Sequence, residues 1–300
     1  MKGLAHLLGI GILVIILSTA DLSSLAEILG KANSRLVGMS LGLHLLIVLI
    51  RAYKWQYIMQ RQGLGYGLWD CCVMYASGMY LGLVTPGRIG EFGRAWYIKE
   101  KYSFGTSMWS VFIDRLTDLL VLGLIASAGV WYFGGGVWVF GLYLMAVILG
   151  VAFIWLKGNG AIEWVFLLFP KLRQKMRENV SDFLQGAHSI RPMDGLWVVW
   201  LTFVVWLLYL LQVYLMSLSL ELQLSFAFVG FSVALAGVVS LLPVTVFGVG
   251  TRDATFIFLF GLAGLGSEPA IALSLMMLLI FLFSAGFGYA AWTKKPIRKL

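Results

Sequence analysis

The chain alternates between long apolar runs and short polar segments rich in glycine, proline and charge. A helix that spans the hydrocarbon core of a bilayer needs about 20 apolar residues. The chain contains nine apolar runs, and all of them except 254–265 come near or exceed this length: 4–20, 36–59, 68–85, 107–132, 136–156, 196–218, 225–247, 254–265 and 270–292. The pattern predicts an all-α polytopic membrane protein, because a helix satisfies every backbone hydrogen bond within itself.

Two stretches of the chain differ from ordinary spans. The run 68–85 ends abruptly at a Pro-Gly pair, and 225–247 is interrupted by a proline and followed by spaced glycines. The run 254–265 rises only about 18 Å as a helix, well short of a hydrocarbon core about 30 Å thick. We therefore expect 68–95 and 225–265 to form re-entrant helical hairpins, each of which enters and leaves the membrane on one side.

The hairpins divide the single membrane domain, 1–300, into two similar halves. A span, a hairpin and a span follow one another in 36–132 and again in 196–292. About six transmembrane helices and two hairpins result, and the halves are inverted repeats with both termini in the cytoplasm. A model in which all nine runs cross also places most lysines and arginines inside, so the positive-inside rule does not distinguish the two models.

Composition agrees with a membrane protein and excludes a soluble enzyme. Apolar residues make up 60% of the chain and charged residues 12%, with a mean hydropathy of +0.90. Soluble domains have about 45–50% apolar residues and about 25% charged residues. The net charge of +8 indicates contact with the cytoplasmic leaflet of the inner membrane, and not with nucleic acid.

The connector 157–195 combines apolar residues at helical spacing with a cluster of positive charge. It predicts a cytoplasmic amphipathic helix, whose basic side chains attract anionic lipids of the inner leaflet. The basic residues are Lys171, Arg173, Lys175 and Arg177.

The tips of the two hairpins carry the most informative residues. Segments 83–95 and 242–254 both run from an apolar helix through proline and spaced glycines to arginine, an acid and alanine. Glycine lets the backbone approach a ligand closely, and arginine binds a phosphate through two parallel hydrogen bonds. We expect a short helix to begin near residue 89 or 90 with free N–H groups that face an anion. The candidate substrate-binding residues are Arg88, Gly90, Glu91 and Arg94 in the first tip, and Gly248, Gly250, Thr251, Arg252 and Asp253 in the second.

Three further candidate substrate-binding residues lie within the apolar run 107–132. Asp114 and Asp118 are four residues apart and share a helix face, and Arg115 is placed to pair with Asp118. Charges in a span normally face the interior of the bundle or a water-filled cavity. Two interpretations stay open: an ion pair that only stabilises the helix, or a part of the substrate path that exchanges protons.

Signatures of catalysis are missing from the sequence. There is no phosphate-binding loop, no nucleophile elbow and no metal-binding spacing among His6, His44 and His188. We expect no metal, no cofactor and no catalytic residue.

The order of three motifs resembles a known family. They are Pro-Gly-Arg-Ile-Gly-Glu-Phe-Gly-Arg at 86–94, Asp-Arg-x-x-Asp at 114–118 and Pro-x-x-x-x-Gly-x-Gly-x-Arg-Asp at 243–253. Together they are similar to the lysylphosphatidylglycerol synthase transmembrane region family, the flippase-like domain of the multiple peptide resistance factor. The family more often has Glu at the positions of Asp114 and Asp253. We expect no aminoacyl-transferring domain in these 300 residues, so the resemblance implies lipid translocation and not lipid aminoacylation.

The leading hypothesis is therefore a lipid flippase or scramblase that moves an anionic, phosphate-bearing lipid between leaflets, either a phospholipid or a polyprenyl-phosphate-linked lipid. Two alternatives stay open at this stage. One is a membrane-embedded lipid-phosphate enzyme that uses Asp114 and Asp118. The other is a non-catalytic partner subunit of a membrane glycosyltransferase.

Overall fold

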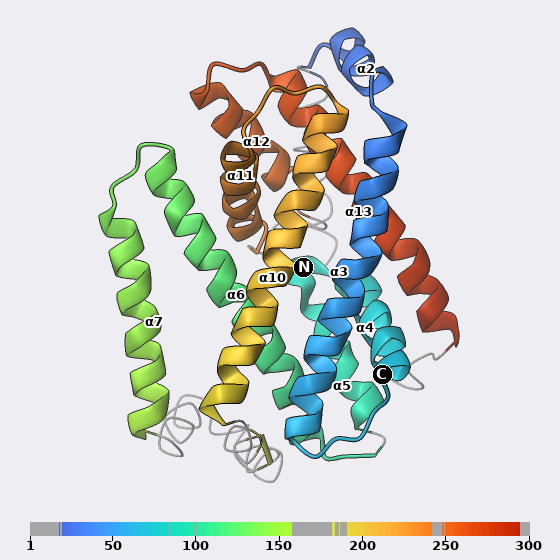
Figure 1. Ribbon diagram of the computed structural model, residues 1–300, viewed down its shortest axis with the longest axis vertical. Coiled ribbons are helices and arrows are strands. Elements are labelled where there is room, and N and C mark those ends of the chain that lie inside the picture. Colours follow the sequence, from blue (N-terminus) through green and yellow to red (C-terminus); the bar gives the residue numbers. More distant parts are fainter. Residues whose placement is uncertain are drawn as a thin grey trace.

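The fold was determined as a computed structural model (Figure 1). It describes residues 20–83, 85–99, 101–157, 191–241 and 250–294, together with Ser18, Asp182, Phe183, Gly186 and Gly248. This part of the chain is helical and contains no strand. The helices are α2 (Leu22–Gly30), α3 (Ser34–Arg61), α4 (Leu68–Leu83), the 3₁₀ helix η1 (Pro86–Gly93), α5 (Arg94–Ile98), α6 (Phe104–Tyr132), α7 (Trp138–Lys157), α10 (Pro192–Ser219), α11 (Phe226–Val239), α12 (Thr251–Leu262) and α13 (Ser267–Lys294).

Long apolar helices form the frame of the molecule. Among the described residues, α3, α10 and α13 are each long and apolar enough to cross a membrane, with 28 residues apiece. Helix α6 has 29 residues but carries the charged cluster at 114–118. Helices α3 and α10 run side by side along the long axis (Figure 1). These features are those of a helical membrane protein.

The start of α3 shows how local sequence sets the helix boundaries. The side chain of Asn33 accepts hydrogen bonds from the backbone N–H groups of Arg35 and Leu36, which have no partner within the helix. The Asn33 N–H itself donates to the carbonyl of Ser219, at the end of α10, over 2.8 Å. One residue therefore begins α3 and fixes it against the end of its neighbour.

The first hairpin consists of α4, η1 and α5. The prediction that a helix begins near residue 89 or 90 with free N–H groups is wrong. The 3₁₀ helix begins at Pro86, and the Gly90 N–H donates to the Thr85 hydroxyl over 2.7 Å. The α-helix resumes only at Arg94 and continues to Ile98, beyond the expected end of the hairpin at residue 95.

The second hairpin consists of α11 and α12. Helix α12 begins after Gly248 and Gly250, whose φ angles of 69° and 88° lie in the left-handed region that glycine tolerates. Asp253 stabilises this start, because its carboxylate accepts the Gly250 N–H over 2.6 Å. The predicted tip residues 242–247 lie outside the described part of the chain.

Packing between the two halves follows a reciprocal pattern. Helix α4 packs against α13, and its counterpart in the other half, α11, packs against α6. Within the halves, α3 contacts α4 as α10 contacts α11, and α5 contacts α6 as α12 contacts α13. Figure 1 shows α11 and α12 in the upper half of the view and α4 and α5 in the lower half. Each half therefore places its hairpin against the closing helix of the other.

Two predicted segments cannot be compared with the structure. All but the last residues of the run 4–20, and the amphipathic helix expected within 157–195, lie outside the described residues.

Candidate functional site

Both hairpins line one internal cavity of about 260 Å³. Arg88 and Glu91 reach it from the first hairpin, and Gly248 and Arg252 from the second. Helix α3 contributes Arg51, and α6 contributes Arg115 and Asp118. The cavity thus brings together charged side chains from segments up to about 200 positions apart in the sequence.

The remaining wall of the cavity is largely apolar. It contains aliphatic and aromatic side chains from both halves: Ile47, Met79, Leu83, Phe92, Leu119, Leu122, Trp206, Tyr209, Val233, Met277 and Phe281. A cavity with a few polar groups in an apolar lining is typical of a ligand site, where the polar groups set orientation and specificity.

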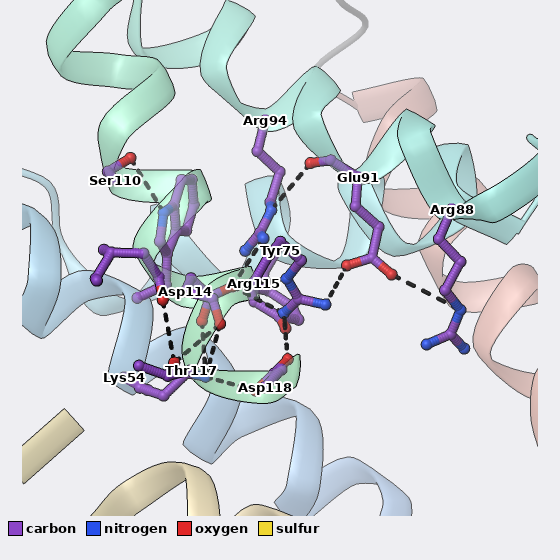
Figure 2. Close-up of polar contacts among 12 residues, drawn as sticks. Lys54, Tyr75, Arg88, Glu91, Arg94, Ser110, Asp114, Arg115, Thr117 and Asp118 are labelled. Carbon is purple, nitrogen blue, oxygen red and sulfur yellow. Dashed lines mark hydrogen bonds and ion pairs between the residues drawn. The ribbon is translucent and has the colours of Figure 1, made fainter. Parts of the chain in front are cut away.

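A network of buried ion pairs adjoins this wall through Glu91, Arg115 and Asp118, and Figure 2 shows its contacts. Its centre is Asp114 on α6, whose side chain is fully buried. One carboxylate oxygen of Asp114 lies 2.9 Å from Lys54 Nζ, and the other lies 2.8 Å from both Arg94 Nη2 and Arg115 Nη2. Lys54 also reaches Asp118 over 2.8 Å. Lys54 is itself fully buried, so each of these charges depends on the others for its partner.

Arg115 connects the buried network to the first hairpin tip. It pairs with Asp118 over 2.8 Å, as its spacing on the helix predicts, and with Glu91 over 2.5 Å. It also donates to the Tyr75 hydroxyl over 2.7 Å. Glu91 in turn lies 3.9 Å from Arg88, whose side chain is 49% exposed (Figure 2). Arg88 is therefore held loosely, at the open end of the network.

Two glycines on α4 make room for the tip. A Cβ atom on Gly78 would lie 2.3 Å from Arg94 Cγ, and one on Gly82 would lie 2.3 Å from Glu91 Cγ. Because residues four apart share a helix face, these glycines form a groove in which Arg94 and Glu91 lie. Arg94 also contacts aromatic rings, with its guanidinium 4.3 Å from the centroid of Tyr75.

The groove gives a direct prediction. Gly78→Ala forces the buried Arg94 side chain away from Asp114, so we expect a loss of about 1–3 kcal/mol in stability, the usual range for overpacking. Gly42→Ala on α3 is the matched control, because nothing lies within 4 Å of its Cβ position. Thermal melting of the purified variants in detergent measures the difference. Equal melting temperatures for the two variants would contradict the proposed packing.

The second tip is held by a different set of partners. Arg252 donates through Nε to Ser274 Oγ over 2.7 Å and through Nη2 to the Ser274 carbonyl over 3.0 Å. Asp253 lies 3.6 Å from the Arg252 guanidinium and accepts a hydrogen bond from the Ser274 hydroxyl. Arg252 is only 4% exposed, yet its Nη1 has no hydrogen-bond partner among the residues that the structure describes.

Phe281 on α13 lies between the two tips. Its ring centroid is 5.8 Å from the guanidinium of Arg88 and 5.4 Å from that of Arg252. An aromatic face attracts a cation, so this ring contacts one arginine from each hairpin.

The predicted site residues divide into two groups. The cavity wall contains Arg88, Glu91, Arg115, Asp118, Gly248 and Arg252. The others do not belong to that wall: Arg94, Asp114 and Asp253 support it through ion pairs and hydrogen bonds, Gly90 and Gly250 shape the tips, and Thr251 donates to the Gly248 carbonyl.

Sequence reasoning missed three residues on α3. Arg51 and His44 line the cavity, and Lys54 is the buried partner of both aspartates. Neither Arg51 nor Lys54 is among the candidate site residues predicted from the sequence. Their position inside the apolar run 36–59 was the available signal, since charged residues within a span usually face the protein interior.

The fold and the cavity define a helical membrane protein with a charged internal site. The model of the lysylphosphatidylglycerol synthase transmembrane region family matches residues 4–288, and the chain belongs to this family. The resemblance inferred from the three motifs is thereby confirmed.

The chain is also similar to curated proteins of two archaea. UPF0104 membrane protein MJ1595 of Methanocaldococcus jannaschii is 22% identical over an alignment of 304 positions. The alignment covers 92% of this chain and 89% of the relative. A UPF0104 membrane protein of Methanothermobacter thermautotrophicus is 22% identical over an alignment of 320 positions, which covers 94% of each chain. No solved structure shows a significant match.

Proposed function

We propose that this protein moves an anionic, phosphate-bearing lipid between the leaflets of the cytoplasmic membrane. One observation carries the proposal: four arginines from both halves of the chain line a single cavity whose other walls are apolar. The family, named after a lipid synthase, supports a role in lipid handling.

The physical demand on such a transporter matches the residues in the cavity. A phosphate that leaves the interface loses its hydration, and an unpaired ion in the membrane interior costs several kcal/mol. Guanidinium groups replace the lost water with charge-assisted hydrogen bonds. The apolar wall lets the acyl or prenyl chains stay in contact with hydrocarbon while the head group passes.

The reciprocal packing of the two halves supports an inverted-repeat mechanism. In transporters built from inverted repeats, interrupted helices from both halves form the site near the middle of the bilayer, and one half rocks against the other. Here the two interrupted segments each contribute an arginine to the same cavity. We propose that 68–95 and 225–265 are re-entrant hairpins that expose the site to the leaflets alternately.

The proposed role is non-catalytic. A general acid or base needs a free carboxyl group within reach of the substrate. Asp114 has both oxygens paired and lies behind the cavity wall, and Asp118 is paired with Lys54 and Arg115. These contacts favour a structural role over acid–base chemistry.

Reconstitution tests the proposal. The purified protein is placed in liposomes that carry fluorescent phosphatidylglycerol, phosphatidic acid or phosphatidylcholine, and a membrane-impermeant quencher reports which lipids change leaflet. We expect the anionic lipids to move faster than in protein-free liposomes. Product formation without movement would support an enzyme, and movement only with a glycosyltransferase present would support a partner subunit.

Topology provides a separate prediction. With about six spans and two hairpins, both termini lie in the cytoplasm. Single cysteines at Gly3 and at Ile297, in a variant without Cys71 and Cys72, should both resist an impermeant thiol reagent in intact cells and react after lysis. Labelling at Gly3 but not at Ile297 would indicate an odd number of crossings and contradict the hairpin model.

A further inference from the structure

The charged groups around the cavity do not balance. Among the described residues, the wall contains four cations, Arg51, Arg88, Arg115 and Arg252, and two carboxylates, Glu91 and Asp118. The groups directly behind it are neutral as a set, since Lys54 and Arg94 offset Asp114 and Asp253. Residues 242–247 contain no ionisable side chain, so the end of the second hairpin does not change this balance. A surplus of two positive charges faces the cavity.

Proton transfer to the carboxylates cannot remove the surplus. Protonation of Glu91 or Asp118 raises the positive charge further, and arginine stays charged at any physiological pH. A net charge of this size in a cavity with apolar walls costs free energy until an anion binds.

Two of the four arginines also have unused donors. Arg51 Nε and Arg252 Nη1 are buried and have no hydrogen-bond partner, and Arg51 forms no ion pair within the described part of the chain. A buried donor without a partner is costly and indicates a missing acceptor. Together with the loosely held Arg88, these groups form a set of donors suited to anionic oxygens.

We infer that the lipid head group carries at least two negative charges, as a phosphomonoester or a diphosphate does, in preference to a singly charged phosphodiester. The inference rests on the proposed function and specifies its substrate class. A doubly charged phosphate neutralises the surplus and offers at least three oxygens to the free donors. A phosphodiester leaves one positive charge and has fewer acceptors.

Ligand-dependent melting in detergent tests the preference. The probes are dioctanoyl phosphatidic acid, geranyl diphosphate, dioctanoyl phosphatidylglycerol and dioctanoyl phosphatidylcholine, at a pH of about 8.5, well above the second phosphate pKa of about 6. We expect phosphatidic acid, with two negative charges, and geranyl diphosphate, with three at this pH, each to bind about tenfold tighter than phosphatidylglycerol, a modest electrostatic difference for a buried site. If phosphatidic acid binds more tightly than geranyl diphosphate, the site prefers a monoester, and the reverse order of affinities indicates a diphosphate site.

A matched pair of variants separates the site from general attraction to positive charge. Arg51→Gln removes one charge of the surplus, so the preference for double charge should fall to about threefold or less. Arg35→Gln removes an exposed arginine at the start of α3 and should keep the full preference. Equal affinity for phosphatidic acid and phosphatidylglycerol in the wild type, or an unchanged preference in Arg51→Gln, would overturn the inference.

The outcomes also distinguish this inference from the proposed function. Transport of phosphatidylglycerol as fast as phosphatidic acid would overturn the charge preference and leave the transport proposal intact. Selective binding of phosphatidic acid or geranyl diphosphate without movement between leaflets would overturn transport and leave the charge preference intact.

Discussion

Asp114→Asn should lower the stability of the protein by about 3–5 kcal/mol, the usual loss when one partner of a buried ion pair is removed. The substitution keeps the shape of the side chain but leaves Lys54, Arg94 and Arg115 without the carboxylate that all three contact. For a chain of this size the corresponding fall in melting temperature is on the order of 10 °C. Thermal melting in detergent measures it.

Glu27→Gln is the matched control for this variant. It also removes one carboxylate from an ion pair, but both side chains of the Glu27–Lys31 pair are largely exposed. Solvent screens such a pair, so the melting temperature should stay close to that of the wild type. Because Asp114 does not line the cavity, transport measured well below the melting temperature should stay within about twofold of the wild type. A loss of transport in a folded Asp114→Asn variant would instead indicate a role in proton exchange.

Arg88→Ala should slow lipid transport about tenfold to a hundredfold, because a hydrogen bond to a charged group contributes about 1.5–3 kcal/mol. The fold should be retained, since the side chain of Arg88 is half exposed and its nearest carboxylate lies 3.9 Å away. The φ angle of Arg88, 58°, is unfavourable for arginine and alanine alike, so the substitution changes the backbone strain little. Liposome transport and melting are measured on the same preparations.

Three companion variants make the Arg88 result interpretable. Arg35→Ala removes the same charge at an exposed position and should transport normally. Arg88→Lys keeps the charge but loses the planar guanidinium that forms two parallel hydrogen bonds, so its transport rate should lie between those of the wild type and Arg88→Ala. Arg252→Ala should both slow transport and lower the melting temperature, because Arg252 also bonds Ser274. Normal transport in a folded Arg88→Ala variant would rule out a phosphate site that includes Arg88.

The sequence was sufficient to predict the class of protein and the positions of the special segments. Apolar run lengths predicted a helical membrane protein, because the bilayer accepts little else. Proline and spaced glycines marked both interrupted segments, and two of the three motifs, at 86–94 and 243–253, lie there. The pair Arg115–Asp118 followed from helical spacing alone, since residues three apart share a face.

Only the tertiary structure decided what each charge contacts. Lys54 and Asp114 are 60 positions apart, and their pairing depends on how α3 packs beside α6. The difference between Arg88, which faces the cavity, and Arg94, which lies buried in a groove of α4, depends on the two glycines of that helix. Local sequence thus determined which segments break and which residues carry charge. Long-range packing determined which arginines are neutralised and which remain available to a ligand, because ion pairing requires contacts that no local pattern encodes.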